Sequence, residues 1–252
     1  AVKGEVSAAV CGTCHAKEVK EFGKSLHAVA MDKMREDPKF GRLSPAMAEM
    51  GCVGCHQIGK RFADGSRGKC NSCHSGHAFS VKEARRPEGC AQCHTGPDHA
   101  HVEMWQTSKH GQLYADEATR TQAPTCVTCH MPRGTHDTGM GLTLGNVANG
   151  AALETNQPAV KMRTISAREA ESQREAMMKT CLPCHSSRFA SESLVNADLV
   201  KQEADALLAD AAKTIERLVA DGTMKPGASG LGKTVASDSV GHAQAALVLG
   251  SD

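Results

Sequence analysis

The sequence is poor in aromatic residues, and this bears on how its interior can be filled. Only seven of its 252 residues are aromatic, namely five Phe, one Trp and one Tyr. Aromatic side chains usually supply much of the apolar area of a protein core. The hydrophobic fraction is a modest 40%, and much of it is alanine. A group other than large side chains is therefore expected to fill the interior.

An excess of charge and long apolar runs are also lacking. The 29 basic and 28 acidic residues leave a net charge of +1, which gives no case for binding nucleic acid or an anionic membrane surface. No apolar run approaches the roughly eighteen residues that a membrane span needs. The chain begins at Ala1 rather than Met, as does a mature chain whose export signal has been removed.

Cysteine, by contrast, is abundant, and all twelve cysteines share one pattern. They form six Cys-x-x-Cys pairs, and a histidine follows the second cysteine each time. Two thiols at this spacing reach the vinyl groups of one haem, and the following imidazole ligates the iron from the proximal side. The six motifs, numbered in chain order, are Cys11, Cys14 and His15; Cys52, Cys55 and His56; Cys70, Cys73 and His74; Cys90, Cys93 and His94; Cys126, Cys129 and His130; and Cys181, Cys184 and His185.

Other uses of Cys-x-x-Cys explain the pattern less well. Zinc ribbons pair two such knuckles for each metal but need no histidine after each one. Redox-active pairs occur once or twice in a chain, and a disulfide framework would not keep one short spacing throughout. The sequence therefore predicts six covalently bound c-type haems, whose porphyrins supply the missing core. Because such attachment takes place outside the cytoplasm, a periplasmic or extracellular location is expected.

Seven histidines remain once six are assigned as proximal ligands. They are His27, His77, His99, His101, His110, His136 and His242. Context favours five of them as distal ligands to the haem irons. His27 and His110 share a Ser-x-His-small pattern, and His77 follows the third motif by one helical turn. His136 stands in a Gly-rich stretch of the kind that supplies ligands to metals, and His242 lies in the C-terminal segment.

The remaining two, His99 and His101, have two interpretations that the spacing leaves equal. Two residues apart, their side chains face different ways on most backbones. Asp98 precedes His99, and a carboxylate beside an imidazole above an open iron is suited to holding and moving protons. In the other interpretation, one of the two histidines ligates the sixth haem. An open haem carries out chemistry, whereas a haem with two strong axial ligands carries electrons.

The rest of the sequence predicts a mainly α multihaem cytochrome fold, with short helices and loops wrapped around a packed haem array. Sustained alternation of β-branched residues, which would indicate strands, is absent. Residues 1–190 are expected to form the six-haem cytochrome domain, with a loop over 132–160. A long helix is predicted over 191–222, where apolar residues recur at nearly heptad spacing before Gly222. Residues 223–252 are expected to be a flexible linker and a short terminal segment.

Beyond single motifs, the chain resembles the hydroxylamine oxidoreductase family of multihaem cytochromes. The resemblance extends from Cys11 to about Phe189, and more loosely to Gly222. It rests on the order and spacing of "GCVGCH", "KCNSCHSGHAFS", "ARRPEGCAQCHTGPDH", "SKHG", "APTCVTCHMPRGTHD" and "TCLPCHSSRFA". Typical members carry eight haems, and this chain is similar to their last six.

The resemblance implies an enzyme with one reacting haem. That haem matches the second motif, in which Cys52 and Cys55 attach the porphyrin and His56 is the proximal ligand. In the family its distal face is open and is lined by the residues that correspond to Asp98 and His99. These two residues are accordingly the predicted catalytic pair.

Other features of the family bear on ligands, direction and assembly. The resemblance implies distal ligation by His110 and leaves His101 without a required role. Oxidising members cross-link the reacting haem to a C-terminal Tyr, whereas the single Tyr here is Tyr114, in a different region. Members without the cross-link reduce nitrite or hydroxylamine. The family also forms trimers through C-terminal helices, so the helix over 191–222 is expected as a subunit contact in a homo-oligomer.

Two functions follow from these observations. In the first, the second haem acts on hydroxylamine or nitrite, and five bis-His haems exchange electrons with a redox partner protein or a quinone-linked carrier. In the second, all six haems are bis-His and the protein is purely an electron conduit. Asp98 and His99 are catalytic in the first, and His99 or His101 is the sixth distal ligand in the second.

Overall fold

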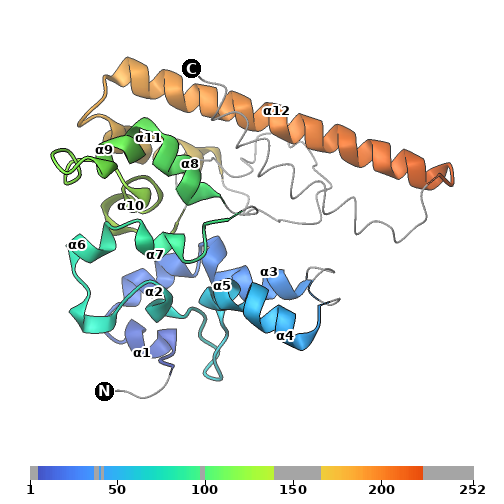
Figure 1. Cartoon of the computed structure of the whole chain (residues 1–252), viewed down its shortest axis with the longest axis horizontal. Coiled ribbons are helices and arrows are strands. Elements are labelled where there is room, and N and C mark those ends of the chain that lie inside the picture. Colours follow the sequence, from blue (N-terminus) through green and yellow to red (C-terminus); the bar gives the residue numbers. More distant parts are fainter. Residues whose placement is uncertain (1–4, 37–39, 41–42, 97–99, 139–165, 224–252) are drawn as a thin grey trace. The chain divides into compact units, whose positions relative to one another are not determined.

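The structure is a computed structural model that describes residues 5–36, 40, 43–96, 100–138 and 166–223. Over these ranges the fold is mainly α-helical, as the sequence predicts (Figure 1). They contain no β-strand, and the only extended pairing among them is an isolated antiparallel bridge between Arg61 and Arg67. The prediction of a mainly α fold is therefore confirmed.

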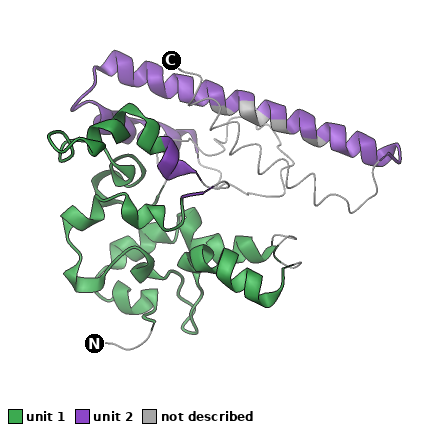
Figure 2. Cartoon of the chain, viewed as in Figure 1, with its two compact units in different colours: residues 1–94, 105–140 green, residues 95–104, 141–252 purple. Residues whose placement is uncertain are grey.

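The chain divides into two compact units, which Figure 2 colours separately. Unit 1 comprises residues 1–94 and 105–140, and unit 2 comprises residues 95–104 and 141–252. The first five Cys-x-x-Cys-His motifs consequently lie in unit 1, and the sixth lies in unit 2. α8 (His101–Thr107) includes residues of both units.

Unit 1 is built from short helices. In chain order they are α1 (Ala8–Gly12), α2 (Ala16–Phe22), η1 (Leu26–Val29), α3 (Ala30–Glu36), α4 (Pro45–Met47), η3 (Ala48–Val53), α5 (Gly54–His56), η4 (Gln57–Gly59), η5 (Cys70–Ser72), η6 (Gly76–Ala78), α6 (Val81–Ala84), α7 (Glu88–Ala91), α9 (Lys109–Ala115), α10 (Cys126–His130) and η7 (Pro132–Gly134). Many of them contain a haem motif or end within one, and α10 consists of the fifth motif alone.

Serine residues begin several helices in the two units. The side-chain oxygens of Ser44, Ser80, Ser108, Ser166 and Ser186 each accept a hydrogen bond of 3.1–3.3 Å from the amide three residues further on. Such a cap satisfies one of the unpaired amides at a helix N-terminus. The cap explains the Ser-x-His-small pattern of "SKHG", because it fixes the start of α9 and places the histidine within its first turn.

Gly111 is the small residue of that pattern, and a larger one does not fit there. A Cβ atom on Gly111 would lie 2.1 Å from the Trp105 carbonyl oxygen and 2.6 Å from Gln106 Cα. Gly111→Ala is therefore expected to destabilise the haem-loaded protein by about 1–3 kcal/mol, the usual cost of overpacking. Thermal unfolding measures the loss. The control is Gly89→Ala in α7, where nothing lies within 4 Å; an equal effect of the two substitutions would contradict the prediction.

The polypeptide's own core is small. Among the described residues, the buried hydrophobic side chains are mostly Ala and Met, and the only large one that is less than 2% exposed is Met177. Several large apolar side chains are exposed instead, including Met50 at 86% and Val81 at 80%. This agrees with the expectation that the polypeptide alone does not supply the interior.

Unit 2 contains two long helices, α11 (Ala167–Cys181) and α12 (Ser187–Ala220), which pack on one another. Arg174 of α11 and Asp198 of α12 form an ion pair of 2.6 Å. The predicted long C-terminal helix is present, and Gly222, with φ +79°, follows its end. The helix exposes Val195, Leu199 and Leu207 at 53–63%. The subunit contact remains a prediction.

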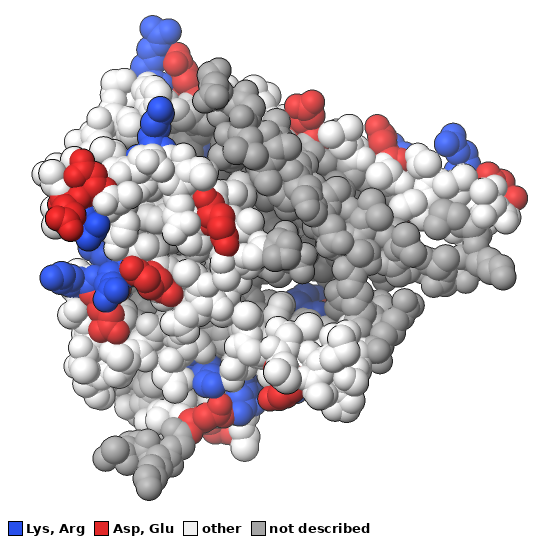
Figure 3. All heavy atoms as spheres, viewed as in Figure 1, with Lys and Arg blue, Asp and Glu red and all other residues white. Residues whose placement is uncertain are grey.

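Charge is evenly distributed on the part of the surface that can be followed. On the face in Figure 3, basic and acidic side chains of the described residues are interspersed among uncharged ones. This fits the near-neutral net charge of the sequence. Across the described residues, no helix combines the length and the hydropathy that crossing a membrane requires.

Candidate metal centres

Five of the six Cys-x-x-Cys-His motifs form a single helical turn, whereas the second spans the end of η3 and all of α5. In the first, third, fourth and sixth motifs, the histidine amide donates a hydrogen bond of 2.9–3.2 Å to the carbonyl of the first cysteine. The fifth motif is a complete helical turn, α10. This bond closes a turn of α-helical type, in which two thiols and an imidazole leave a short stretch of backbone. The conformation suits attachment of one porphyrin at each of these five motifs.

The thiols of the motifs lie where a porphyrin edge can reach them. All twelve cysteines are within the described ranges, and none of them forms a disulfide. None is fully buried either: Cys14, Cys73 and Cys184 are exposed, and the other nine, Cys129 among them, are half-buried. This accessibility is what covalent attachment needs, since each sulfur must approach a vinyl group of the haem. Attachment at the twelve cysteines nevertheless stays a prediction from the motifs.

Thiols of different motifs meet in unit 1. Burial, followed by the neighbouring Cys11 thiol, raises the pKa of Cys70 to about 11. Burial, followed by a hydrogen bond with Cys55, raises the pKa of Cys93 to about 11. The first motif is therefore next to the third, and the second is next to the fourth.

A third contact joins the fourth and fifth motifs. A hydrogen bond with the Cys90 thiol lowers the pKa of Cys126 to about 7, and the same contact raises the pKa of Cys90. Once a haem is attached, these thiols are thioethers and no longer titrate. The contacts still show which motifs are neighbours. The fourth motif is next to both the second and the fifth.

The predicted proximal histidines at the two ends of the series have side-chain neighbours of their own. The exposed His15 of the first motif has its Nδ1 4.0 Å from Glu18 Oε2, one turn further along α2. This contact leaves Nε2 of the ring for an iron. The half-buried His185 of the sixth motif stacks on Phe189 of α12, with ring centroids 4.8 Å apart and planes inclined by 23°. Proximal ligation by His15, His130 and His185 stays a prediction.

Two pairs of imidazoles bring a proximal histidine to a predicted distal one. The first pair is His94, of the fourth motif, and His27, in η1, whose ring centroids are 5.9 Å apart with the planes inclined by 56°. The Thr138 hydroxyl lies 3.4 Å from His27 Nδ1, which leaves Nε2 for another partner. Burial lowers the pKa of His27, and this favours the neutral imidazole that binds metals.

The second pair is His74, of the third motif, and His136, which follows η7. Their ring centroids are also 5.9 Å apart, and the planes are inclined by 18°. His136 is held from two sides, because its amide donates to Glu21 Oε2 at 2.9 Å and its Nδ1 lies 3.1 Å from the Gly134 carbonyl oxygen. Burial is the main cause that lowers the pKa of His74, and the charge of His136 adds to it.

The spacing within both pairs fits an iron between the rings. Metal–imidazole bonds are about 2 Å long, so two imidazoles on opposite sides of one metal have ring centroids roughly 6 Å apart. The observed 5.9 Å agrees with this value in both pairs. The residues present therefore fit the haems that the motifs predict, because the ring spacing in each pair leaves room for an iron that both imidazoles would hold.

The second motif is arranged differently. His56 ends α5, and its Nδ1 lies 3.1 Å from the carbonyl oxygen of Ala30, the first residue of α3. In the described part of the chain, no other histidine ring stacks on that of His56. Metal-ligating histidines commonly make such a bond through the second ring nitrogen, which fixes the tautomer and raises the basicity of the ligand.

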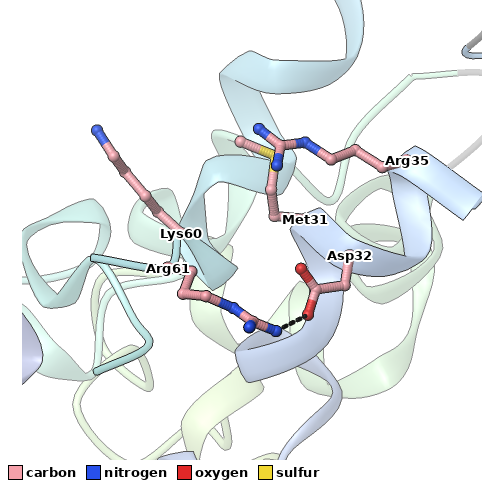
Figure 4. A pocket seen from close by; sticks show the side chains of 5 residues that line it. All are labelled: Met31, Asp32, Arg35, Lys60 and Arg61. Atoms are coloured by element: carbon pink, nitrogen blue, oxygen red, sulfur yellow. Dashed lines mark hydrogen bonds and ion pairs between the residues drawn. The ribbon is translucent and has the colours of Figure 1, made fainter. Parts of the chain in front are cut away.

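A polar cavity of roughly 340 Å³ lies beside this motif in unit 1. It is lined by Met31, Asp32 and Arg35 from α3, and by Lys60 and Arg61 from the segment that follows η4. In Figure 4, Arg61 reaches across to the Asp32 carboxylate, and the two form an ion pair of 3.3 Å. The ion pair joins the chain after the second motif to the helix that carries the His56 acceptor.

The other predicted site residues are less well placed by the structure. His77 is exposed in η6, and His110 is half-buried at the second position of α9. His101 is the exposed first residue of α8. The catalytic pair Asp98 and His99, and the distal ligand His242, lie outside the described residues. Distal ligation by His77, His110 and His242 accordingly stays a prediction.

Three residues that contact the predicted ligands were not predicted from the sequence. Glu21, Ala30 and Thr138 contact His136, His56 and His27 respectively. Two of these contacts use a backbone group or a hydroxyl from a distant part of the chain. No local pattern marks such residues, and only the folded chain brings them to the ligands.

Known proteins that are similar to this chain are multihaem cytochromes. A family model described as "Seven times multi-haem cytochrome CxxCH" matches residues 5–230. A protein of Kuenenia stuttgartiensis, named a probable nitrite reductase-hydroxylamine oxidoreductase fusion protein, is 27% identical over 258 residues. The match covers 86% of this chain but only 29% of that protein.

Two solved structures are similar in fold. A reducing HAO-like protein complex of Kuenenia stuttgartiensis matches with a TM-score of 0.65 and 28% identity, covering 87% of this chain and 50% of that one. A structure described as a hypothetical multiheme protein matches with a TM-score of 0.69, covering 96% of this chain and 74% of that one. At 19% identity the second likeness shows the fold alone. The predicted resemblance to hydroxylamine oxidoreductase-like cytochromes is confirmed.

Proposed function

The chain belongs to the multi-haem cytochrome CxxCH family, and on that premise we propose that it is an oxidoreductase with six covalently bound c-type haems. The haem of the second motif acts on a small nitrogen compound, hydroxylamine or nitrite, and the other five carry electrons. The names of the fusion protein and of the reducing HAO-like complex support this substrate class and a reducing direction. The chain spans 29% of the fusion protein and 50% of the matched chain of the complex, so the activity proposed is that of this part alone.

The observation that carries the proposal is the two imidazole pairs. The rings of His27 and His94, and those of His74 and His136, have the centroid spacing that two imidazoles holding one iron between them would need. Haems with two imidazole ligands suit electron transfer, and an open haem suits chemistry on a ligand. The pairs thus support electron transfer at the third and fourth motifs. The second motif is the one that the family resemblance assigns to the reaction.

The thiol contacts support a route for the electrons. The second motif meets the fourth through Cys55 and Cys93, and the fourth meets the fifth through Cys90 and Cys126. A separate contact joins the first and third motifs through Cys11 and Cys70. In this scheme the fourth haem is the immediate electron donor to the reacting one.

The chain's own residues would supply protons and positions at the reacting haem. When bound, the haems supply irons that exchange electrons and, where one face is open, bind a small ligand. We assign Asp98 and His99 to holding and delivering protons at that face, as general acid and base. His56, held by the Ala30 carbonyl, orients the proximal side. His77, His110 and His242 are assigned as distal ligands at the remaining haems.

Location, partner and assembly complete the proposal. Covalent c-type attachment supports a periplasmic or extracellular site of action. Electrons then come from a redox partner protein or a quinone-linked carrier. The exposed apolar side chains of α12 support a homo-oligomer formed through this helix.

Electron paramagnetic resonance of the oxidised, haem-loaded protein tests the function. One haem with an open face is expected to give a high-spin ferric signal, beside low-spin signals from the bis-His haems. Adding nitrite or hydroxylamine is expected to perturb that high-spin signal. A spectrum with six low-spin haems would instead identify a pure electron conduit in which His99 or His101 closes the last site.

A further inference from the structure

η4 packs on the segment Leu26–Met31 at a distance that only glycine permits. A Cβ atom on Gly59 would lie 2.6 Å from the His27 carbonyl oxygen, 2.8 Å from the Ala30 amide nitrogen and 3.0 Å from the Met31 amide nitrogen. All three are backbone atoms, so no flexible side chain can move aside. Gly59 itself is buried. The contact therefore fixes the separation between η4 and the junction of η1 and α3.

Both sides of this contact carry predicted axial ligands. η4 directly follows His56, the proximal histidine of the second motif. The facing segment carries His27, which pairs with His94 of the fourth motif. The same segment supplies the Ala30 carbonyl that accepts the bond from His56 Nδ1. The segment Leu26–Met31 thus contacts the proximal ligand of the second haem and carries the distal ligand of the fourth.

Neighbouring interactions hold the two sides together. The Asp32 carboxylate of α3 pairs with Arg67 at 2.6 Å and with Arg61 at 3.3 Å, and Figure 4 shows Arg61 facing Asp32 across the cavity. The Lys69 amide donates a bond of 2.9 Å to the Ile58 carbonyl inside η4. The two ion pairs hold the chain after Gly59 against α3, and the bond at Ile58 ties η4 to Lys69, two residues beyond Arg67.

We propose that Gly59 is a positioning residue that sets the proximal imidazole of the second haem and the distal imidazole of the fourth through a single backbone contact. A shift of the segment Leu26–Met31 changes the bond from His56 Nδ1 to Ala30 and moves His27 relative to His94. A hydrogen bond at the second ring nitrogen raises the basicity of the ligand, so the electron affinities of the two haems are adjusted together. The inference rests on the proposed function in taking the second haem as the reacting one.

Gly59→Ala in the haem-loaded protein tests the inference. The added methyl group must push η4 from the segment and weaken the bond between His56 and Ala30. Resonance Raman spectroscopy of the reduced protein is expected to show the iron–histidine stretch of the second haem at lower frequency. Electron paramagnetic resonance is expected to show shifted g values for the low-spin haem that His27 ligates, which His27→Ala identifies. Redox titration should show the midpoint potentials of both haems displaced.

Gly51→Ala is the matched control, because Gly51 lies in η3 just before the second motif and a Cβ atom there would have nothing within 4 Å. It should leave both signals unchanged. A folded Gly59→Ala protein in which neither haem or only one haem changes would overturn the proposal. If that variant does not fold, Asp32→Asn loosens the same contact more mildly, and both signals must move in the same directions by smaller amounts.

The two proposals fail in different ways. If the wild-type protein shows no iron–histidine stretch, the second haem is not open, and the proposed function is wrong. Gly59 is then judged on the g values and the two midpoint potentials, which do not depend on an open face.

Discussion

Replacing His99 with alanine is expected to slow reduction of nitrite or hydroxylamine by about a hundredfold or more, because positioned acid–base groups contribute that much to proton transfer. Asp98→Asn is expected to act in the same direction, since it removes the carboxylate but keeps its shape. Steady-state turnover with an artificial electron donor measures both. The high-spin ferric signal should persist in both variants, because neither residue is proposed as an iron ligand.

His101→Ala is the matched control for this prediction, as it removes an imidazole two positions away. It should keep turnover and the high-spin signal near their wild-type levels. If His101→Ala instead creates a high-spin haem that the wild type lacks, His101 is the sixth distal ligand and the protein is a conduit. If His99→Ala has that effect, His99 is the ligand and its acid–base role is wrong.

His27→Ala is expected to convert one haem from low-spin to high-spin, the largest spectroscopic change among the distal variants. His27 and His94 are spaced as the two axial ligands of the fourth haem, so removing His27 leaves that iron with one strong ligand. Electron paramagnetic resonance should show the loss of one low-spin signal and a second high-spin signal. Turnover should also fall, because the fourth haem is the proposed donor to the second.

His136→Ala separates the spectroscopic effect from the kinetic one. His136 pairs with His74 of the third motif, and that motif is joined by a thiol contact to the first rather than to the second. The variant should also gain a high-spin signal, but with a smaller loss of turnover. Unchanged spectra in either variant would show that the imidazole pairs do not ligate haem.

Local features of the structure can be predicted from the sequence because local interactions determine them. In four of the six Cys-x-x-Cys-His motifs the histidine amide closes a single turn on the first cysteine, so the conformation of these predicted attachment sites follows from spacing. The small core follows from the scarcity of aromatic residues. The long helix follows from apolar periodicity and from the left-handed Gly222 at its end.

Long-range features cannot be predicted in the same way. Context predicts His27 and His136 as distal ligands, but nothing in it indicates that they lie next to His94 and His74. That pairing depends on the tertiary packing that places η1 beside the fourth motif and the residues after η7 beside the third. The close approach of Gly59 to the η1–α3 junction cannot be predicted either. A glycine can serve a turn, a flexible segment or a close backbone contact, and only the folded structure shows that Gly59 serves the last.

The small apolar core also bears on the order of events when the protein is made. Over the described residues the buried hydrophobic side chains are mostly Ala and Met, and burying them is expected to contribute too little to offset the entropy of ordering the backbone. Binding free energy from a prosthetic group then becomes folding free energy, as it does for small metallodomains. We therefore expect attachment to precede compaction, with the newly made polypeptide meeting the attachment machinery as an open chain and the neighbouring short helices condensing around each porphyrin.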